Sequence, residues 1–169
     1  SMKKVYHTWR NVQGACLDIA RQMHNHNWRP DYIVGITRGG LVPANLLSQY
    51  TGIKMCSLDI SLRDGGDCVS NLGMAEDAFN GKNILIVDDI NDQGSTVAWI
   101  KTDWPSGCFP DDPKWSTIWG DNVRFAVLTH NQSSQFKDPD YHVWTVNKAE
   151  EDCWLVYPWE EFGYDIIIN

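Results

Sequence analysis

The sequence lacks any run that approaches the roughly 20 consecutive apolar residues of a transmembrane helix, and it has no charged-then-apolar start typical of a signal peptide. Its five cysteines are odd in number and widely scattered, with no C-x-x-C pair. This spacing favours reduced thiols over a disulfide framework or a zinc site. We therefore expect a cytoplasmic protein with no membrane partner.

The chain has fewer basic than acidic residues. It has 14 lysines and arginines and 22 aspartates and glutamates, which gives a formal net charge of -8. Non-specific binding to nucleic acid requires a basic surface, so we expect no nucleic-acid partner. With 43% hydrophobic and 21% charged residues, the chain has a globular composition, and no repeat interrupts it. We predict one domain over residues 1–169.

Short apolar segments alternate with helical patterns along the chain. Apolar residues spaced by three and four predict an amphipathic helix over 9–26. Strands are predicted at 31–36, 53–60, 83–88, 123–129, 141–146 and 153–158, and further helices at 41–52 and 95–103. The glycine-rich residues 61–81 are predicted to be mainly loop with at most one helical turn, and 104–122 a long connection. This order predicts an α/β fold with a doubly wound, mostly parallel sheet.

Two adjacent carboxylates, Asp88 and Asp89, follow the apolar run at 84–87. The run has no polar alternation, which is typical of a central parallel strand buried on both faces. Neighbouring strand residues point to opposite faces, so we expect the two carboxylates not to share one pocket. Like charges beside a buried strand are unfavourable unless a ligand uses them. In such sheets ligands bind beyond the carboxyl ends of strands, and we predict a binding site here.

The next segment, NDQGST, leads directly into the helix predicted at 95–103. Gly94 permits a close backbone approach, and the amides of Gln93 to Thr96 would lie at the helix N-terminus, where they bind anions well. The alternative is ordinary N-capping by Asp92. No G-x-x-x-x-G-K motif is present, so this is not a Walker P-loop. An anion-binding turn beside two carboxylates suits a phosphorylated sugar.

Three segments of the chain resemble type I phosphoribosyltransferases. The segment ILIVDDINDQGST (84–96) closely resembles the family's phosphoribosyl-diphosphate (PRPP) signature. The segment VGITRGGLVPANLL (34–47) resembles the family's pyrophosphate-binding loop. The C-terminal segment of bacterial and archaeal xanthine, guanine or hypoxanthine phosphoribosyltransferases is similar to CWLVYPWE (153–160). The resemblance implies the type I fold with a small base-binding hood from about 130–169. It also implies transfer of the phosphoribosyl group of PRPP to a 6-oxopurine, giving a nucleoside 5-monophosphate and pyrophosphate.

The resemblance implies a role for each matching residue. The PRPP-binding set is Asp88, Asp89, Asp92, Gln93, Gly94, Ser95 and Thr96, and the pyrophosphate-binding set is Thr37, Arg38 and Gly39. Asp92 and Arg38 are the implied catalytic residues, with Asp92 accepting the proton from N7 of the base. Mg2+ would lie at Asp88 and Asp89, held mostly by substrate oxygens and water. A homodimer or homotetramer is also implied.

The implied base-binding residues and two departures from the family pattern complete the assignment. Trp154 would stack on the purine beside the Leu155 backbone, although a buried core tryptophan is the alternative. Where many members have a Ser-Tyr pair, this chain has Leu62 and Arg63 after Ser61, and Arg63 could contact pyrophosphate or simply be solvated. Where members commonly have a lysine for the purine 6-oxo group, this chain has LTHNQSS, so His130 is the candidate donor.

Two other functions remain open. One is a regulatory protein that senses PRPP on the same fold, and the other is transfer to a different heterocyclic base. The glycine-rich residues 61–73 are expected to form a mobile lid over PRPP. The tryptophans at 104, 115 and 119 are expected to pack against their own domain or a second subunit, because exposing their apolar surface would be unfavourable.

Overall fold

The computed structural model describes residues 2–60 and 72–160. Arg63 and residues 61–71 of the predicted lid lie outside the described residues.

A five-stranded parallel sheet forms the centre of the molecule, with the strand order β3-β2-β4-β5-β6. Its strands are β2 (Tyr32–Ile36), β3 (Met55–Leu58), β4 (Ile84–Asn91), β5 (Val123–Asn131) and β6 (Trp144–Val146). Strand β4 is central, and its first four residues are all buried, as the absence of polar alternation predicts. The carboxyl ends of all five strands therefore point to the same edge.

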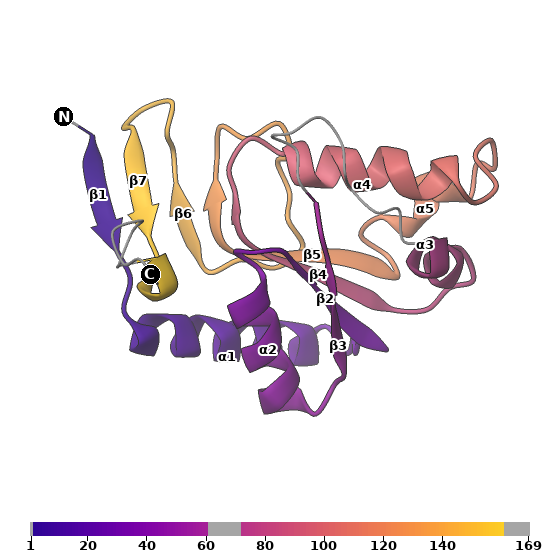
Figure 1. The fold of residues 1–169 in the computed structure, drawn as a ribbon, viewed down its shortest axis with the longest axis horizontal. Helices are drawn as coiled ribbons and strands as arrows, with labels where there is room; N and C mark the ends of the chain where they lie inside the picture. Colours follow the sequence, from indigo (N-terminus) through magenta and orange to yellow (C-terminus); the bar gives the residue numbers. More distant parts are fainter. Residues whose placement is uncertain (1, 61–71, 161–169) are drawn as a thin grey trace, which may run out of the picture.

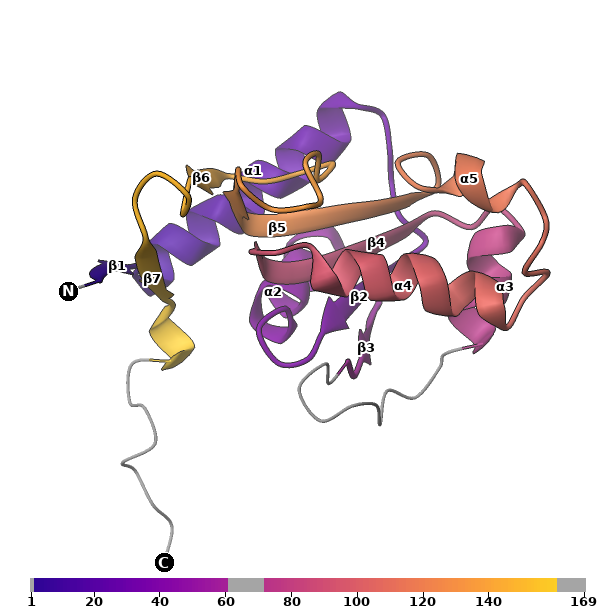
Figure 2. The ribbon, with the colours of Figure 1, turned by 90° about the horizontal axis from the view of Figure 1, so that it is seen from above.

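Helices cover both faces of this sheet (Figures 1 and 2). Helices α1 (Trp9–Asn25) and α2 (Leu41–Thr51) pack on one face in a single hydrophobic cluster. Helices α3 (Leu72–Phe79), α4 (Ser95–Ser106) and α5 (Trp115–Ile118) pack on the other. The doubly wound α/β fold expected from the sequence is confirmed.

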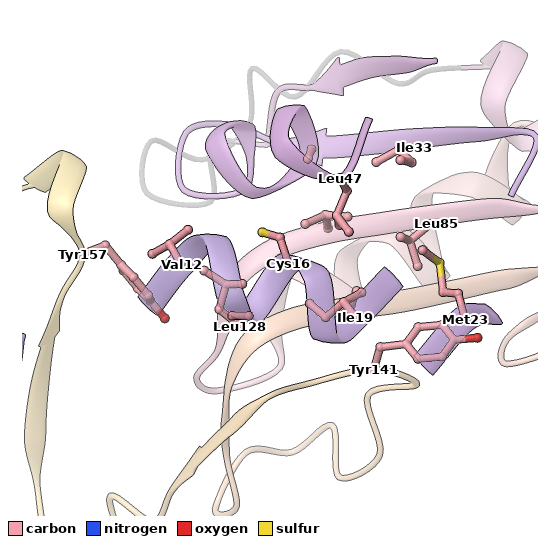
Figure 3. Packing of buried hydrophobic residues seen from close by; sticks show 14 of the residues in the cluster. Val12, Cys16, Ile19, Met23, Ile33, Leu47, Leu85, Leu128, Tyr141 and Tyr157 are labelled. Atoms are coloured by element: carbon pink, nitrogen blue, oxygen red, sulfur yellow. The ribbon is translucent and has the colours of Figure 1, made fainter. Parts of the chain in front are cut away.

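Helix α1 follows the predicted apolar stripe. Thr8 and Asn11 form a reciprocal capping box at its start. Its buried stripe, which includes Val12, Cys16 and Ile19, faces β4 and β5 (Figure 3). Burial raises the pKa of the Cys16 thiol to about 12, so this cysteine behaves as a core side chain and not as a reactive thiol.

Several elements differ from the sequence-based expectation. An eight-residue helix, α3, occupies 72–79, where mainly loop was predicted. It forms because Met74, Ala75 and Ala78 bury one side against the sheet. Helix α4 continues to Ser106, so the predicted connection at 104–122 begins later and itself contains α5. Strand β5 runs to Asn131, which places His130 inside a strand instead of in the loop after it.

A second sheet joins the two ends of the described chain. The N-terminal strand β1 (Lys3–Tyr6), which the sequence pattern did not predict, pairs in parallel with β7 (Cys153–Val156). Figure 1 shows this pair standing beside the main sheet, beyond β6. The predicted strand at 153–158 thus belongs to this small sheet and ends in a 3-10 turn, Pro158–Glu160.

The tryptophan-rich region packs within its own domain. Trp104 and Trp115 are 1% and 5% exposed, and Trp119 lies against both rings. Phe79 of α3 also contacts Trp115. Trp104 and Trp115 are thus buried within their own domain without a second subunit, and Trp119 is half-buried against the same cluster.

Candidate active site

The two carboxylates of β4 lie within the strand, near its carboxyl end. Asp88 and Asp89 both line one cavity of about 280 Å³, so the expectation that they do not share one pocket is wrong. The reason is local: the main-chain N–H of Asp89 donates to Asp88 Oδ1 at 2.8 Å, and that of Ile90 donates to Asp89 Oδ1 at 2.9 Å. Each carboxylate is thus held close to the main chain of the residue that follows it.

This arrangement is electrostatically unfavourable in the absence of a ligand. Burial raises the pKa of Asp88 well above its usual value, and the charge of Asp89 raises it further. Burial also raises the pKa of Asp89. Hydroxyl donors or a cation would relieve this destabilisation. The pair therefore has the properties of a ligand-binding site and not of a stabilising structural contact.

The turn after β4 presents an open helix N-terminus. Gly94 is the N-cap residue of α4, with φ 87°, and no side chain caps the helix. The alternative of capping by Asp92 is therefore wrong. A Cβ on Gly94 would approach the main-chain nitrogen of Phe136 to 2.8 Å, so glycine is required by both conformation and space. The backbone N–H groups of the first turn remain available for an anion.

The turn after β2 lies directly against the carboxylate pair. A Cβ on Gly39 would overlap the carboxylate of Asp89, and one on Gly40 would overlap the carbonyl oxygen of Val87. The two glycines thus allow this turn to approach β4 closely. Its Thr37–Arg38 peptide bond is cis, the Thr37 hydroxyl donates to Asp59 at 2.8 Å, and the Arg38 side chain is exposed.

Asp92 is held by two residues from other parts of the chain. Lys148, in the turn after β6, places its Nζ 3.1 Å from Asp92 Oδ1. Asn131, at the end of β5, donates from Nδ2 to the Asp92 carbonyl oxygen at 2.8 Å and accepts at Oδ1 from the main-chain N–H of Lys148 at 3.0 Å. Asn131 is 3% exposed. It therefore fixes the two turns relative to each other.

A second, polar cavity of about 660 Å³ opens on this side of Asp92. Its lining includes Asn131, Lys148 and Asp152 as well as Asp92. Asp92, Gln93 and Ser95 line both cavities, so the two cavities lie side by side at this turn. A ligand with a sugar-phosphate part and a second polar part could occupy both.

His130 is placed away from both cavities. It is 6% exposed, and Asn91 Nδ2 lies 3.0 Å from its Nδ1. Burial and the neighbouring His142 lower the pKa of His130, which favours the neutral ring with Nδ1 as acceptor. The His130 side chain lines neither cavity, and its expected contact with a base stays a prediction.

The C-terminal segment reaches the site through a residue that the sequence did not single out. Trp154 is 55% exposed and Leu155 is buried against β1, and neither lines the two cavities. Tyr157, in contrast, donates from its hydroxyl to the Asp89 carbonyl oxygen at 2.9 Å.

Sequence reasoning also missed Lys148 and Asn131. Lys148 lies in a polar turn with no motif, and only the fold brings it to Asp92.

Within residues 2–60 and 72–160, no group of three or more His, Cys, Asp or Glu side chains could hold a metal ion. In the same part of the chain, no helix is long and apolar enough to cross a membrane.

The central strand of this parallel sheet carries two carboxylates and leads to an uncapped helix N-terminus, which is the place where open α/β sheets bind ligands. The phosphoribosyl transferase domain model matches residues 3–161. The chain belongs to the phosphoribosyltransferase family.

The chain is similar to several named phosphoribosyltransferases. It is 21% identical to xanthine phosphoribosyltransferase 1 of Saccharomyces cerevisiae, over 94% of this chain and 90% of that protein. It is 29% identical to the xanthine-guanine phosphoribosyltransferase of Cereibacter sphaeroides, over 80% and 71%. The crystal structure of a purine phosphoribosyltransferase from Pyrococcus horikoshii superposes with a TM-score of 0.67 and 26% identity, covering 99% of this chain and 100% of that one.

Proposed function

We propose that this protein is a Mg2+-dependent purine phosphoribosyltransferase that transfers the phosphoribosyl group of PRPP to a 6-oxopurine. The observation that carries the proposal is the meeting of three features at one edge of the sheet. These are the Asp88–Asp89 pair, the uncapped N-terminus of α4 and the glycine turn at Gly39. The substrates in the names of the similar proteins, xanthine, guanine and purine, support the choice of base.

PRPP would be bound by residues from two turns. The amides and hydroxyls of residues 93–96 would hold the 5-phosphate, because the helix N-terminus offers unpaired N–H groups. Asp88 and Asp89 would accept hydrogen bonds from the ribose hydroxyls, which relieves the repulsion between the two carboxylates. Thr37 to Gly39 would hold pyrophosphate, with Arg38 neutralising part of the charge of the leaving group. Arg63 is an additional candidate for this role.

A divalent cation fits this site. Two carboxylates, without a third acidic ligand among the described residues, match Mg2+, which keeps several waters and takes further oxygens from phosphate substrates. When bound, it would stabilise the negative charge that develops on pyrophosphate. The raised pKa values of Asp88 and Asp89 are consistent with a site that gains from a cation.

The base would be recognised by Asp92 and Lys148 together. A 6-oxopurine that reacts through N9 presents an N7–H donor and an O6 acceptor side by side on one edge. Asp92 supplies an acceptor and Lys148 a donor, with 3.1 Å between their charged atoms. Asp92 would take the N7 proton, and Lys148 would donate to O6. Adenine has an amino group in place of O6 and would set two donors against each other.

The roles of Trp154 and Leu155 in base binding stay predictions, since neither residue lines the two cavities. His130 remains a candidate for the O6 contact, but its Nδ1 is already paired with Asn91, whereas Lys148 lines the cavity beside Asp92.

We also propose a cytoplasmic homodimer or homotetramer with PRPP and a purine base as its partners. The cysteines among the described residues, Cys16, Cys56, Cys108 and Cys153, are unpaired, which supports a reducing compartment.

PRPP binding tests the proposal directly. Isothermal titration calorimetry with PRPP and Mg2+ should give saturable binding to the unmodified protein. Asp88→Asn and Asp89→Asn should weaken it, because each amide removes an acceptor for a ribose hydroxyl. Asp111→Asn, an exposed carboxylate outside the site, is the matched control and should bind as the unmodified protein does. Absence of PRPP binding to the unmodified protein would refute the proposal.

A further inference from the structure

Tyr157 links the C-terminal segment to the carboxylate pair. It follows β7 and is 1% exposed. Figure 3 shows its side chain extending from the C-terminal segment toward Val12 and Leu128 in the core. Its hydroxyl lies 2.9 Å from the Asp89 carbonyl oxygen and 2.8 Å from Thr129 Oγ1.

The direction of these two hydrogen bonds follows from counting protons. A carbonyl oxygen can only accept, so the single phenolic proton of Tyr157 is given to Asp89. The Thr129 hydroxyl must then donate to the oxygen of Tyr157. Burial and the charge of Asp89 raise the pKa of Tyr157 well above its usual value, so the phenol keeps this proton at neutral pH.

The Tyr157 ring is fixed by aromatic neighbours from three parts of the chain. It stacks on Trp159 with ring centroids 4.9 Å apart and planes 3° apart. It also stacks on His7 at 5.6 Å, and His7 stacks on Trp144 of β6 at 3.9 Å. The Tyr157 ring therefore belongs to a stack of rings that joins the C-terminal segment to His7, just after β1, and to Trp144 of β6.

We infer that Tyr157 is a positioning residue that sets the backbone of Asp89 so that its carboxylate meets the ribose of PRPP. This inference rests on the proposed function. Carboxylates that bind a sugar must be held to within a fraction of an ångström, and the Asp89 side chain is tied to its own backbone through Ile90. A shift of that backbone therefore moves the carboxylate. Tyr157 acts on PRPP through Asp89 and touches neither substrate.

The test is Tyr157→Phe, which keeps the stacked ring and removes only the hydroxyl. The dissociation constant for PRPP with Mg2+, measured by calorimetry, should rise about tenfold, and the KM for the base should stay unchanged. The matched control is Tyr141→Phe. Tyr141 is also fully buried, and its hydroxyl accepts from Arg124 at 2.8 Å, on the α1 side of the core. This control should lower the thermal stability to a similar degree without changing PRPP binding.

Substitutions of Thr129 provide an independent check if Tyr157→Phe folds poorly. Thr129→Val removes the donor to Tyr157 and should weaken PRPP binding. Thr129→Ser keeps the hydroxyl and should restore the affinity, even though loss of the methyl group destabilises the buried strand. A purely structural role would make both variants bind PRPP alike.

These experiments distinguish failure of the inference about Tyr157 from failure of the proposed function. If the unmodified protein binds PRPP and Tyr157→Phe binds it equally well, the inference is overturned and the proposed function stands. If Tyr141→Phe weakens PRPP binding as much as Tyr157→Phe does, the effect is one of stability and the inference is again overturned. If the unmodified protein binds no PRPP, the proposed function fails and the inference fails with it.

Discussion

The ammonium group of Lys148 lies 3.1 Å from a carboxylate oxygen of Asp92 and joins the turn after β6 to the turn after β4. The two side chains are 22% and 41% exposed, and an ion pair this accessible contributes only about 0–1 kcal/mol to stability. Its position between two cavities is more informative than its energy. In the proposed function, this adjacent acceptor and donor would face N7 and O6 of the purine.

Lys148→Gln should impair base selection. Because the amide is a weaker donor than the ammonium group, kcat/KM for guanine, hypoxanthine or xanthine should fall about tenfold to hundredfold relative to adenine. The KM for PRPP should change little. Lys82→Gln is the matched control, since Lys82 also pairs with an aspartate, Asp77, at 3.4 Å but outside the site. Unchanged discrimination in Lys148→Gln would exclude the lysine from base recognition.

His130→Ala should affect stability more than selectivity. Removing the ring leaves one hydrogen of the buried Asn91 amide without its acceptor, which should lower the free energy of unfolding by about 1–3 kcal/mol. Urea denaturation measures that loss, and steady-state assays with four purines measure the ranking of bases. A changed ranking at unchanged stability would show that His130, and not Lys148, contacts the 6-oxo group.

Asp88→Asn should stabilise the ligand-free protein at high pH. A folded-state pKa raised above the unfolded value means that the folded protein holds the proton more tightly. Stability is therefore greatest at low pH and is lost as the pH rises through the window between the two pKa values. The variant escapes this loss, which amounts to about 1.4 kcal/mol for each pH unit that the window spans.

Urea unfolding at pH 8 and at about pH 4 measures this effect. The stabilising effect of Asp88→Asn should be present at pH 8 and absent near pH 4, where Asp88 is protonated. Asp111→Asn, on an exposed carboxylate, should be neutral at both pH values. A destabilised Asp88→Asn protein at pH 8 would mean that the carboxylate is structural.

Gly39→Ala should damage the site without unfolding the protein. The added methyl group would overlap the Asp89 carboxylate, and a displacement of about 1 Å at a catalytic site can reduce the rate about 100-fold. The control is Gly14→Ala. Gly14 lies on the exposed side of α1, where an added methyl group would meet no atom within 4 Å, so alanine should raise the free energy of unfolding by about 0.5–1 kcal/mol. Full activity in Gly39→Ala would contradict the close packing of the two turns.

The sequence predicted those parts of the site that are local in the chain. Asp88 to Thr96 lie at the carboxyl end of β4 and in the turn after it, and Thr37 to Gly39 follow β2. In a parallel sheet, adjacent strands bring such segments to the same edge. The geometry within the turn was harder to predict. Period-two alternation suggested that Asp88 and Asp89 diverge, but hydrogen bonds to the main chain bring them together.

Long-range contacts account for what was missed. Lys148 lies far from Asp92 in sequence, and its turn has no distinguishing motif, so only the packing of β6 beside β5 brings them together. Strand β1 has the composition of an exposed segment and forms because β7 lies beside it. Helix α3 contains Gly73 and is followed by Gly81. Its helical conformation depends on burying Met74 and Ala78 against the sheet.

Turnover of PRPP with each of the four purines is the most direct test of the proposed activity. Purified protein, PRPP and Mg2+ would be incubated with guanine, hypoxanthine, xanthine or adenine, and both pyrophosphate and nucleotide would be measured. We predict equal amounts of pyrophosphate and nucleoside 5-monophosphate with at least one 6-oxopurine, and much slower turnover with adenine. No nucleotide from any base would contradict the proposed activity, and fastest turnover of adenine would contradict the assignment of Asp92 and Lys148 to the 6-oxopurine edge.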